Sequence, residues 1–186
     1  MTLSVRRSVA ALAVGAALVM AGCGGPAGPD RAAVVGGRVI SETAVQSAMS
    51  EINSMNPALL QDKLTPTGTL TALVQAPVVL SYLSDLGVKV SDSVATADAQ
   101  KRGVANPSDS TLEILRFASA IGLAQNEGKL TDTDAQALTQ KLQGLSIDVN
   151  PRYGTFNPQT AAIELTKPAW VKPLPAASAP APSPSQ

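Results

Sequence analysis

The sequence predicts a mainly α-helical domain of about five helices, closed by a small β element of two or three strands. Leu, Val, Ile and Ala recur at helical spacing through the middle of the chain, and short strand-like segments flank them. Hydrophobic residues make up 45% of the chain but aromatic residues only 3%, so aliphatic side chains must build the core. We expect one domain over residues 32–165.

The N-terminus has the composition of an export signal that ends in a lipid anchor. Two arginines precede an uncharged run from Val9 to Met20, and the small residues Ala21 and Gly22 precede Cys23, the only cysteine. Residues 1–22 therefore read as a removable signal. The pattern resembles a bacterial lipobox, which implies cleavage between Gly22 and Cys23 and acylation, for example with palmitate. The cell membrane would then hold the protein on its extracytoplasmic face. An ordinary secretory signal with a chance cysteine is the alternative.

A short linker and a strand lead into the first helix. Residues 23–31 are polar and contain Gly and Pro, so they are expected to tether the domain. Residues 32–40 form a strand-like run that two glycines interrupt with a tight turn or a bulge. Ser41 is expected to cap a helix, which ends before Asn56-Pro57.

Two further helices follow. The second, over residues 67–86, is apolar on nearly every side, so we expect it to be the central, buried helix. Pro77 should kink it and Gly87 should end it. The third helix is predicted over residues 92–102, with Ser91 as its cap.

The last two helices are predicted over residues 110–126 and from Thr131 onward. The pairs Thr131/Asp134 and Ser110/Glu113 are typical of helix starts. The side chains expected to point inward are Leu112, Leu115, Phe117, Ile121 and Leu123 from the fourth helix, and Ala135, Leu138, Leu142 and Leu145 from the fifth.

Strand character returns after the helices, over residues 146–150 and 160–165. Between them, residues 150–154 have turn chemistry and carry Arg152 and Tyr153. We interpret this cluster as a structural turn that fixes the last strand, with contact to a ligand or partner as the alternative.

Residues 166–186 are rich in Pro, Ala and Ser and are predicted to form a disordered tail. Trp170 lies in this tail between prolines. It could dock on the domain or sit at a lipid interface, where Trp is favoured, and nothing in the sequence decides between the two.

Composition excludes several classes of function. Without residues 1–22 the chain has 12 basic against 14 acidic residues and no basic stripe, which argues against nucleic acid as a partner. It has no histidine, the commonest general base and metal ligand. No calcium-loop or phosphate-loop spacing occurs. We therefore predict no enzyme activity, no cofactor and no metal.

Two segments carry a resemblance to a known family. AAVVGGRVISETAV, residues 32–45, and SDSVATADAQKR, residues 91–102, resemble the N-terminal chaperone domain of SurA-type periplasmic chaperones and trigger-factor-like proteins. Residues 149–156 also resemble the end of short actinobacterial lipoproteins with this domain. The resemblance implies that the late strand pairs with the first one. It does not extend to a prolyl isomerase domain, for which the chain has no room.

The resemblance implies a chaperone-like protein that binds unfolded or extended polypeptide at the membrane without isomerase activity. Met suits adaptable binding surfaces, so the candidate contact residues lie on the first helix: Val45, Met49, Ile52 and Met55. The alternative for these residues is ordinary core packing. The alternative function is a structural or assembly lipoprotein that serves one cell-envelope partner.

Overall fold

The structure is a computed structural model and describes residues 30–165. A β-hairpin begins this part of the chain. β1 (Arg31–Val35) and β2 (Arg38–Ser41) pair antiparallel. The two glycines between them have φ angles of 55° and 88°. Glycine adopts such angles at little cost, so the tight turn that the glycine pair predicted is confirmed.

The first helix begins where its capping pattern indicates, whereas the second begins one residue before its predicted start, after a cap that was not predicted. The Ser41 hydroxyl accepts a hydrogen bond from the Ala44 amide and starts α1 (Glu42–Ser54). Thr65 caps α2 (Pro66–Asp85) in the same way. α2 continues as one helix through Pro77, and Gly87, with φ of 79°, follows its end.

The other three helices are α3 (Asp92–Lys101), α4 (Asp109–Asn126) and α5 (Asp132–Gln143). Their caps are Ser91, Ser108 and Thr131. Five helices were predicted, and five are present in the described range.

The predicted start of α4 is wrong by one position, and so is the role given to Ser110. Ser108, not Ser110, is the cap, and its hydroxyl accepts from the Thr111 amide. Ser110 is buried and donates a hydrogen bond to the Ala44 carbonyl, joining α4 to α1. The side chain of Glu113 pairs with Arg38 rather than with the helix start. Ser108 and Ser110 lie two residues apart at the start of this helix, so the sequence alone did not single out the cap.

Three short strands close the fold. β3 (Ile147–Val149) pairs antiparallel with β1, as the resemblance implied, so β1 is the middle strand of the order β2-β1-β3. β4 (Thr155–Asn157) pairs antiparallel with β5 (Ala162–Glu164) in a second sheet. β5 was predicted, whereas β4 was not.

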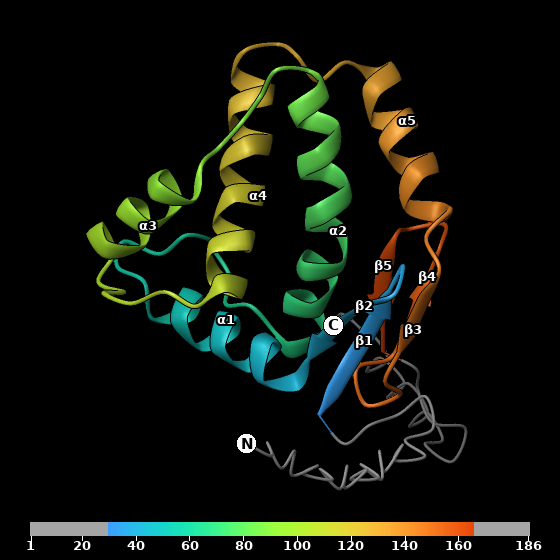
Figure 1. Ribbon diagram of the computed structural model, residues 1–186, viewed down its shortest axis with the longest axis horizontal. Coiled ribbons are helices and arrows are strands. Elements are labelled where there is room, and N and C mark those ends of the chain that lie inside the picture. Colours follow the sequence, from blue (N-terminus) through green and yellow to red (C-terminus); the bar gives the residue numbers. More distant parts are fainter. Residues whose placement is uncertain (1–29, 166–186) are drawn as a thin grey trace, which may run out of the picture.

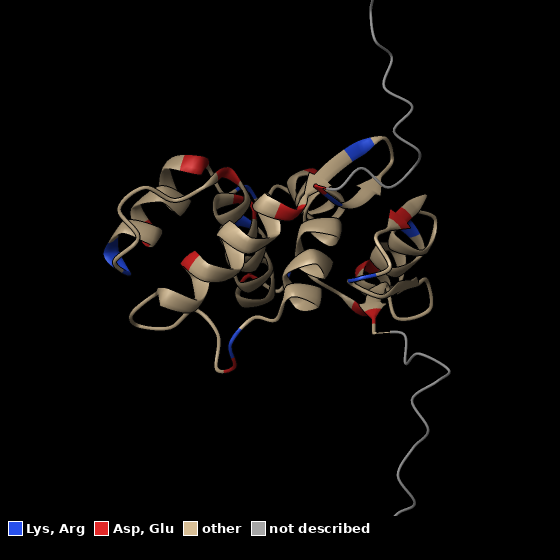
Figure 2. Ribbon diagram, turned by 90° about the horizontal axis from the view of Figure 1, so that it is seen from below, with Lys and Arg blue, Asp and Glu red and all other residues tan. Residues whose placement is uncertain are grey.

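α2 is the central helix, as predicted from its apolar composition. It packs against α1, α4, α5, β1 and β5, and seven of its side chains are buried. In Figure 1, α4, α2 and α5 stand side by side, α1 crosses beneath α4 and α2, and the strands lie below α5. Lys and Arg are interspersed with Asp and Glu rather than gathered on one face (Figure 2).

Two hydrophobic clusters fill the interior, one around each half of α2. The prediction for Leu123 is wrong, because its side chain is 39% exposed; Ala120 and Ala124 are buried on α4 instead. On α5, Leu138 and Leu142 are buried as predicted, whereas Ala135 is exposed. α5 therefore contributes a narrower apolar face than the sequence indicated.

Candidate functional site

The predicted client-contact residues do not form an open surface. Val45, Ile52 and Met55 are buried in the main core, and only Met49 is half-buried. α1 packs directly on α4 and α2, so these side chains have the ordinary core role that was the alternative. The apolar spacing along α1 predicted a helix face correctly. It could not show that other helices already cover that face.

A groove lined by apolar and charged side chains lies instead between α3 and α4, next to the loop that follows α1. It is an open groove of about 620 Å³. We call it the α3–α4 groove and define it by its lining residues, Leu59, Val94, Ala97, Asp98, Lys101, Arg102, Ala118 and Ser119. Cavities of this size are common ligand sites.

One exposed apolar side chain lines the α3–α4 groove, and two more are close to its lining residues in the chain. Val94, on its wall, is 57% exposed, and Leu60, next to Leu59, is 44% exposed. Leu123 lies one turn beyond Ser119, on the same side of α4. Of the five large hydrophobic residues that are exposed in residues 30–165, one lines the groove and two lie within four residues of its lining in the chain.

The rim of the α3–α4 groove is held by Arg102. Its guanidinium pairs with Asp98 at 3.0 Å, and its Nη1 donates to the carbonyls of Pro57 and Ala58 at 3.0 and 3.3 Å. These bonds fix the loop after α1 against α3. Arg102 therefore ties together two of the three segments that line the groove, the loop and α3, while α4 is held against α3 by packing.

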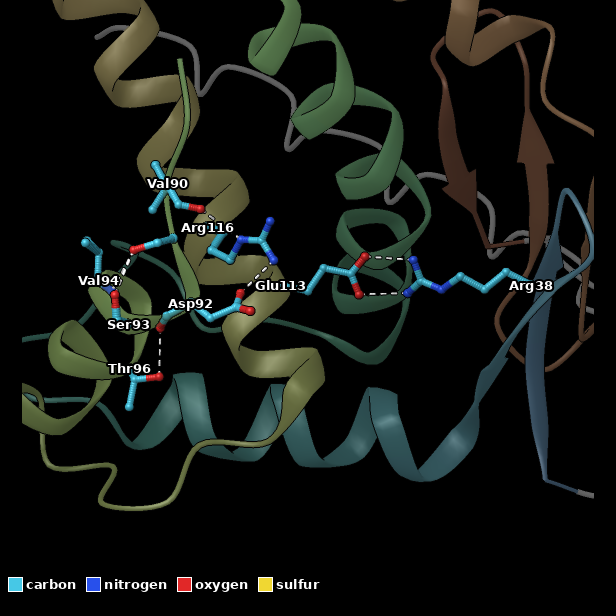
Figure 3. Close-up of polar contacts among 9 residues, drawn as sticks. Arg38, Val90, Asp92, Ser93, Val94, Thr96, Glu113 and Arg116 are labelled. Carbon is cyan, nitrogen blue, oxygen red and sulfur yellow. Dashed lines mark hydrogen bonds and ion pairs between the residues drawn. The ribbon is translucent and has the colours of Figure 1, made fainter. Parts of the chain in front are cut away.

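A second hollow, of about 530 Å³, lies between α2 and α4. Arg38, on the hairpin, meets Glu113 through two 2.7 Å hydrogen bonds (Figure 3). Arg116 donates to Asp92 at 2.7 Å and to the Val90 carbonyl at 3.1 Å. Three carboxylates line this hollow: Glu113 and Asp92 pair with guanidinium groups, and Asp109 is exposed at the start of α4. We interpret the two ion pairs as structural contacts that join α4 to the hairpin and to α3.

The turn at residues 150–154 makes structural contacts, as its interpretation predicted. The Asn150 amide donates to the Ala32 carbonyl and its side chain to the Arg31 carbonyl, both at 2.9 Å. Arg152 pairs with Glu42 at the start of α1. The turn thus fixes the end of β3 to the first strand and the first helix.

Tyr153, in the same turn, is buried, and within the described residues its hydroxyl has no hydrogen-bond partner. Burial raises the pKa of Tyr153 above its ordinary value, and the nearby Gln46 side chain offsets part of that effect. Within the described residues this hydroxyl is therefore buried without a hydrogen bond of good geometry.

One titratable contact holds α5 against α2. The Tyr82 hydroxyl donates to Asp134 at 2.7 Å, and Asp134 also completes a capping box with Thr131. Hydrogen bonds from Thr131 and Tyr82 lower the pKa of Asp134, because they favour its charged form. The same contact with Asp134 raises the pKa of Tyr82.

Several predicted residues and segments lie outside the part of the chain that the structure describes. Gly22, Cys23 and Trp170 lie outside the described residues, as do the signal, most of the linker and the tail. Within residues 30–165 no helix is long and apolar enough to cross a membrane. The same range holds no group of three His, Cys, Asp or Glu side chains that could bind a metal ion.

Comparison with protein-family models, with curated proteins and with solved structures found no match.

Sequence reasoning missed the α3–α4 groove. A signal was present, because Val94 is a large apolar residue on a short helix whose other side chains are polar or small. Its exposure, however, depends on how α3 packs on α4, which local spacing does not determine.

Proposed function

We propose that this chain is a lipid-anchored extracytoplasmic protein that binds unfolded or extended polypeptide in the α3–α4 groove, without catalysis. The observation that carries the proposal is the apolar wall formed by Val94 and Leu59, with exposed apolar neighbours. Covering such a surface is favourable by about 25 cal/mol per Å² of apolar area. The resemblance to SurA-type domains supports the same class of function.

The floor of the α3–α4 groove favours low selectivity. Ala97, Ala118 and Ser119 are small, so the backbone of an extended segment can approach the helices closely. The rim carries charges of both signs, and Asp98 and Arg102 neutralise each other. Such a groove attracts apolar segments without demanding one charge pattern. This is what a general client binder needs.

Two exposed valines give a matched test of the groove. Val94→Asp introduces a charge on the groove wall, and Val39→Asp introduces the same charge on the hairpin, where Val39 is 59% exposed. An acidic residue suits the first turn of α3, so the first variant should fold normally. We expect Val94→Asp to weaken suppression of aggregation of a denatured client several-fold, and Val39→Asp to behave as wild type.

Two results would contradict this function. One is a wild-type protein that fails to suppress aggregation at any molar excess. The other is an equal loss in both valine variants, which would remove the groove from the mechanism. Crosslinking in living cells followed by mass spectrometry adds a third measurement. One partner recovered in stoichiometric amount would favour the assembly-subunit function over client binding.

The anchor is tested separately through Cys23. We expect the wild-type protein to incorporate labelled palmitate and to remain with the membrane fraction. Cys23→Ser should abolish the label and release the protein, because two acyl chains anchor a protein far more stably than none. Unchanged retention of Cys23→Ser would overturn the lipoprotein assignment and leave the groove proposal untouched.

A further inference from the structure

We propose that residues 57–63, in the loop after α1, form a flap that closes one side of the α3–α4 groove and opens to admit a client. We call this segment the 57–63 flap. Figure 1 shows the loop passing beside α3, and Leu59 is the side chain that it contributes to the lining of the groove. The inference rests on the proposed function, because it concerns how that groove is regulated.

Both ends of the 57–63 flap are fixed. At one end, the Asn56 amide donates to the Arg102 carbonyl at 2.9 Å. At the other end, the Asn53 side chain donates to the Leu64 carbonyl at 2.9 Å and accepts from the Leu64 amide at 2.8 Å. Asn53 belongs to α1, so the helix before the flap also holds its far end. A segment fixed at its two ends can swing while the helices on either side keep their structure.

Between these ends the flap is held weakly. Among the described residues, residues 57–63 make no backbone–backbone hydrogen bond, and their only side-chain hydrogen bonds are those that Arg102 donates. Leu59 is partly buried, whereas the other six residues of the flap are exposed. Segments with few hydrogen bonds and few buried apolar side chains open most readily. Opening the flap therefore breaks the contacts of one guanidinium and one leucine.

The guanidinium of Arg102 can release the flap without becoming an unpaired charge. Its Nε donates to both carboxylate oxygens of Asp98, at 3.1 and 3.0 Å. Only Nη1 bonds to the flap, through the carbonyls of Pro57 and Ala58. The side chains of Arg102 and Asp98 are 23% and 32% exposed, so water can replace the two carbonyls. The ion pair stays on α3 whether the flap is open or closed.

The closed flap occupies a position that an apolar client side chain would use. Leu59 lines the groove and also packs against the main hydrophobic cluster. When the flap opens, an apolar side chain of the client can take the place that Leu59 leaves. One apolar contact then replaces another, and the cluster is not left facing water. Because only the open form accepts the client there, the closed fraction lowers the apparent affinity.

A spin label in the flap measures its motion without any client. The chain has one cysteine, so Cys23→Ser combined with Gln61→Cys places a single label at an exposed position of the flap. We expect Arg102→Lys to raise the mobility of this label in the purified full-length chain. Lysine keeps the charge but lacks the planar fork that binds a carboxylate and two carbonyls together. An unchanged electron paramagnetic resonance spectrum in Arg102→Lys would overturn the proposal.

Arg116→Lys is the matched control. Arg116 also joins a carboxylate to a backbone carbonyl, through Asp92 and Val90, but it contacts no residue of the flap. We expect Arg116→Lys to leave the mobility of the label at position 61 unchanged. An equal rise in both lysine variants would show a general loosening of the domain and would overturn the role of Arg102.

Client binding is tested with a short fluorescein-labelled peptide of alternating Leu and Ser. Because the closed flap competes with the peptide, Arg102→Lys should lower its Kd several-fold, and Arg116→Lys should bind it as wild type does. A rigid wall predicts the opposite, since loosening a wall weakens binding. Unlabelled peptide added to the otherwise wild-type chain should also raise the mobility of the label at position 61. The same label at Gln125→Cys, on α4, should not respond.

The outcomes separate the flap from the groove. Peptide binding that Val94→Asp weakens, but that Arg102→Lys leaves unchanged or also weakens, would overturn the flap and support the groove. Peptide binding that Val94→Asp leaves unchanged would place the peptide elsewhere and would overturn both. Absence of binding in wild type and in Arg102→Lys alike would overturn both as well.

Discussion

The two halves of α2 are held in different ways. Contacts from distant parts of the chain hold the N-terminal half: Thr67 donates to the Tyr153 carbonyl at 3.1 Å, and Gln75 to the Ala161 carbonyl at 2.7 Å. The C-terminal half packs against α5 mainly through Leu138 and Leu142. In the described part of the chain, the one side-chain hydrogen bond from α2 to α5 joins Tyr82 to Asp134.

This difference indicates where the molecule opens first. Local unfolding is cheapest where few buried apolar side chains and few hydrogen bonds must be given up. α5 meets these conditions, whereas the sheets, α1 and the N-terminal half of α2 share one core. We expect α5 to separate from α2 before the rest of the domain unfolds.

The largest effect is expected in the core around the N-terminal half of α2. Leu73 is fully buried there, so Leu73→Ala should lower the free energy of unfolding by about 2–5 kcal/mol. Leu142 lies at the edge of the other cluster, so Leu142→Ala should lower the free energy of unfolding by an amount at the lower end of that range. Urea denaturation measures both, and a larger loss in Leu142→Ala would reverse the comparison.

The next effect concerns the turn that joins the two sheets. Gly154 has φ of 117°, and a Cβ there would collide with the carbonyl of Glu164. We expect Gly154→Ala to lower the free energy of unfolding by about 3 kcal/mol or more. Gly37→Ala is the matched control, because its φ is 88° but nothing lies within 4 Å of the added carbon. Gly37→Ala should lower the free energy of unfolding by about 1 kcal/mol, because it adds backbone strain but no collision.

The contact between Tyr82 and Asp134 should make the docking of α5 depend on pH. The pKa of Asp134 is lowered, so its contribution is complete above the ordinary value of 3.8 and is lost as the pH falls through the lowered pKa. The pKa of Tyr82 is raised above 10.0, so the contact is also lost when the pH rises through that raised value.

Thermal unfolding of wild type and Asp134→Asn across this pH range tests the contact. The difference between their midpoints should be largest near neutral pH and should shrink at acid pH. A difference that stays constant down to strongly acid pH would show that the charge of Asp134 does not hold α5.

The smallest effect is expected at Tyr153, and it should be stabilising. Tyr153→Phe removes a buried hydroxyl without a partner in the described structure and keeps the ring. We expect the free energy of unfolding to rise by up to about 1 kcal/mol. A clear loss of stability in urea denaturation would mean that the hydroxyl is hydrogen-bonded in solution, with Gln46 as the first candidate.

Local signals explain how much of this fold could be predicted. Ser41, Ser91 and Thr131 cap their helices with their own hydroxyl groups, and the glycine pair forms its turn through backbone freedom alone. Such features need no distant partner. The start of α4 was misplaced because Ser108 and Ser110 offer the same chemistry, and only the packing of Ser110 on α1 separates them.

Features that depend on distant contacts were the ones missed. β4 is only three residues long, and its pairing with β5 makes it a strand. The apolar face of α1 could be predicted, but its burial beneath α4 and α2 could not. The α3–α4 groove is a space between elements, so no single stretch of sequence encodes it.

The position of β1 has a mechanical consequence. The chain enters the fold through β1, which is bonded to β2 on one side and to β3 on the other. A pull on the N-terminal segment is therefore shared by two hydrogen-bonded ladders at once, rather than peeling a single strand from an edge. A domain tethered through its N-terminal segment would therefore resist a pulling force best at β1, where that force is applied.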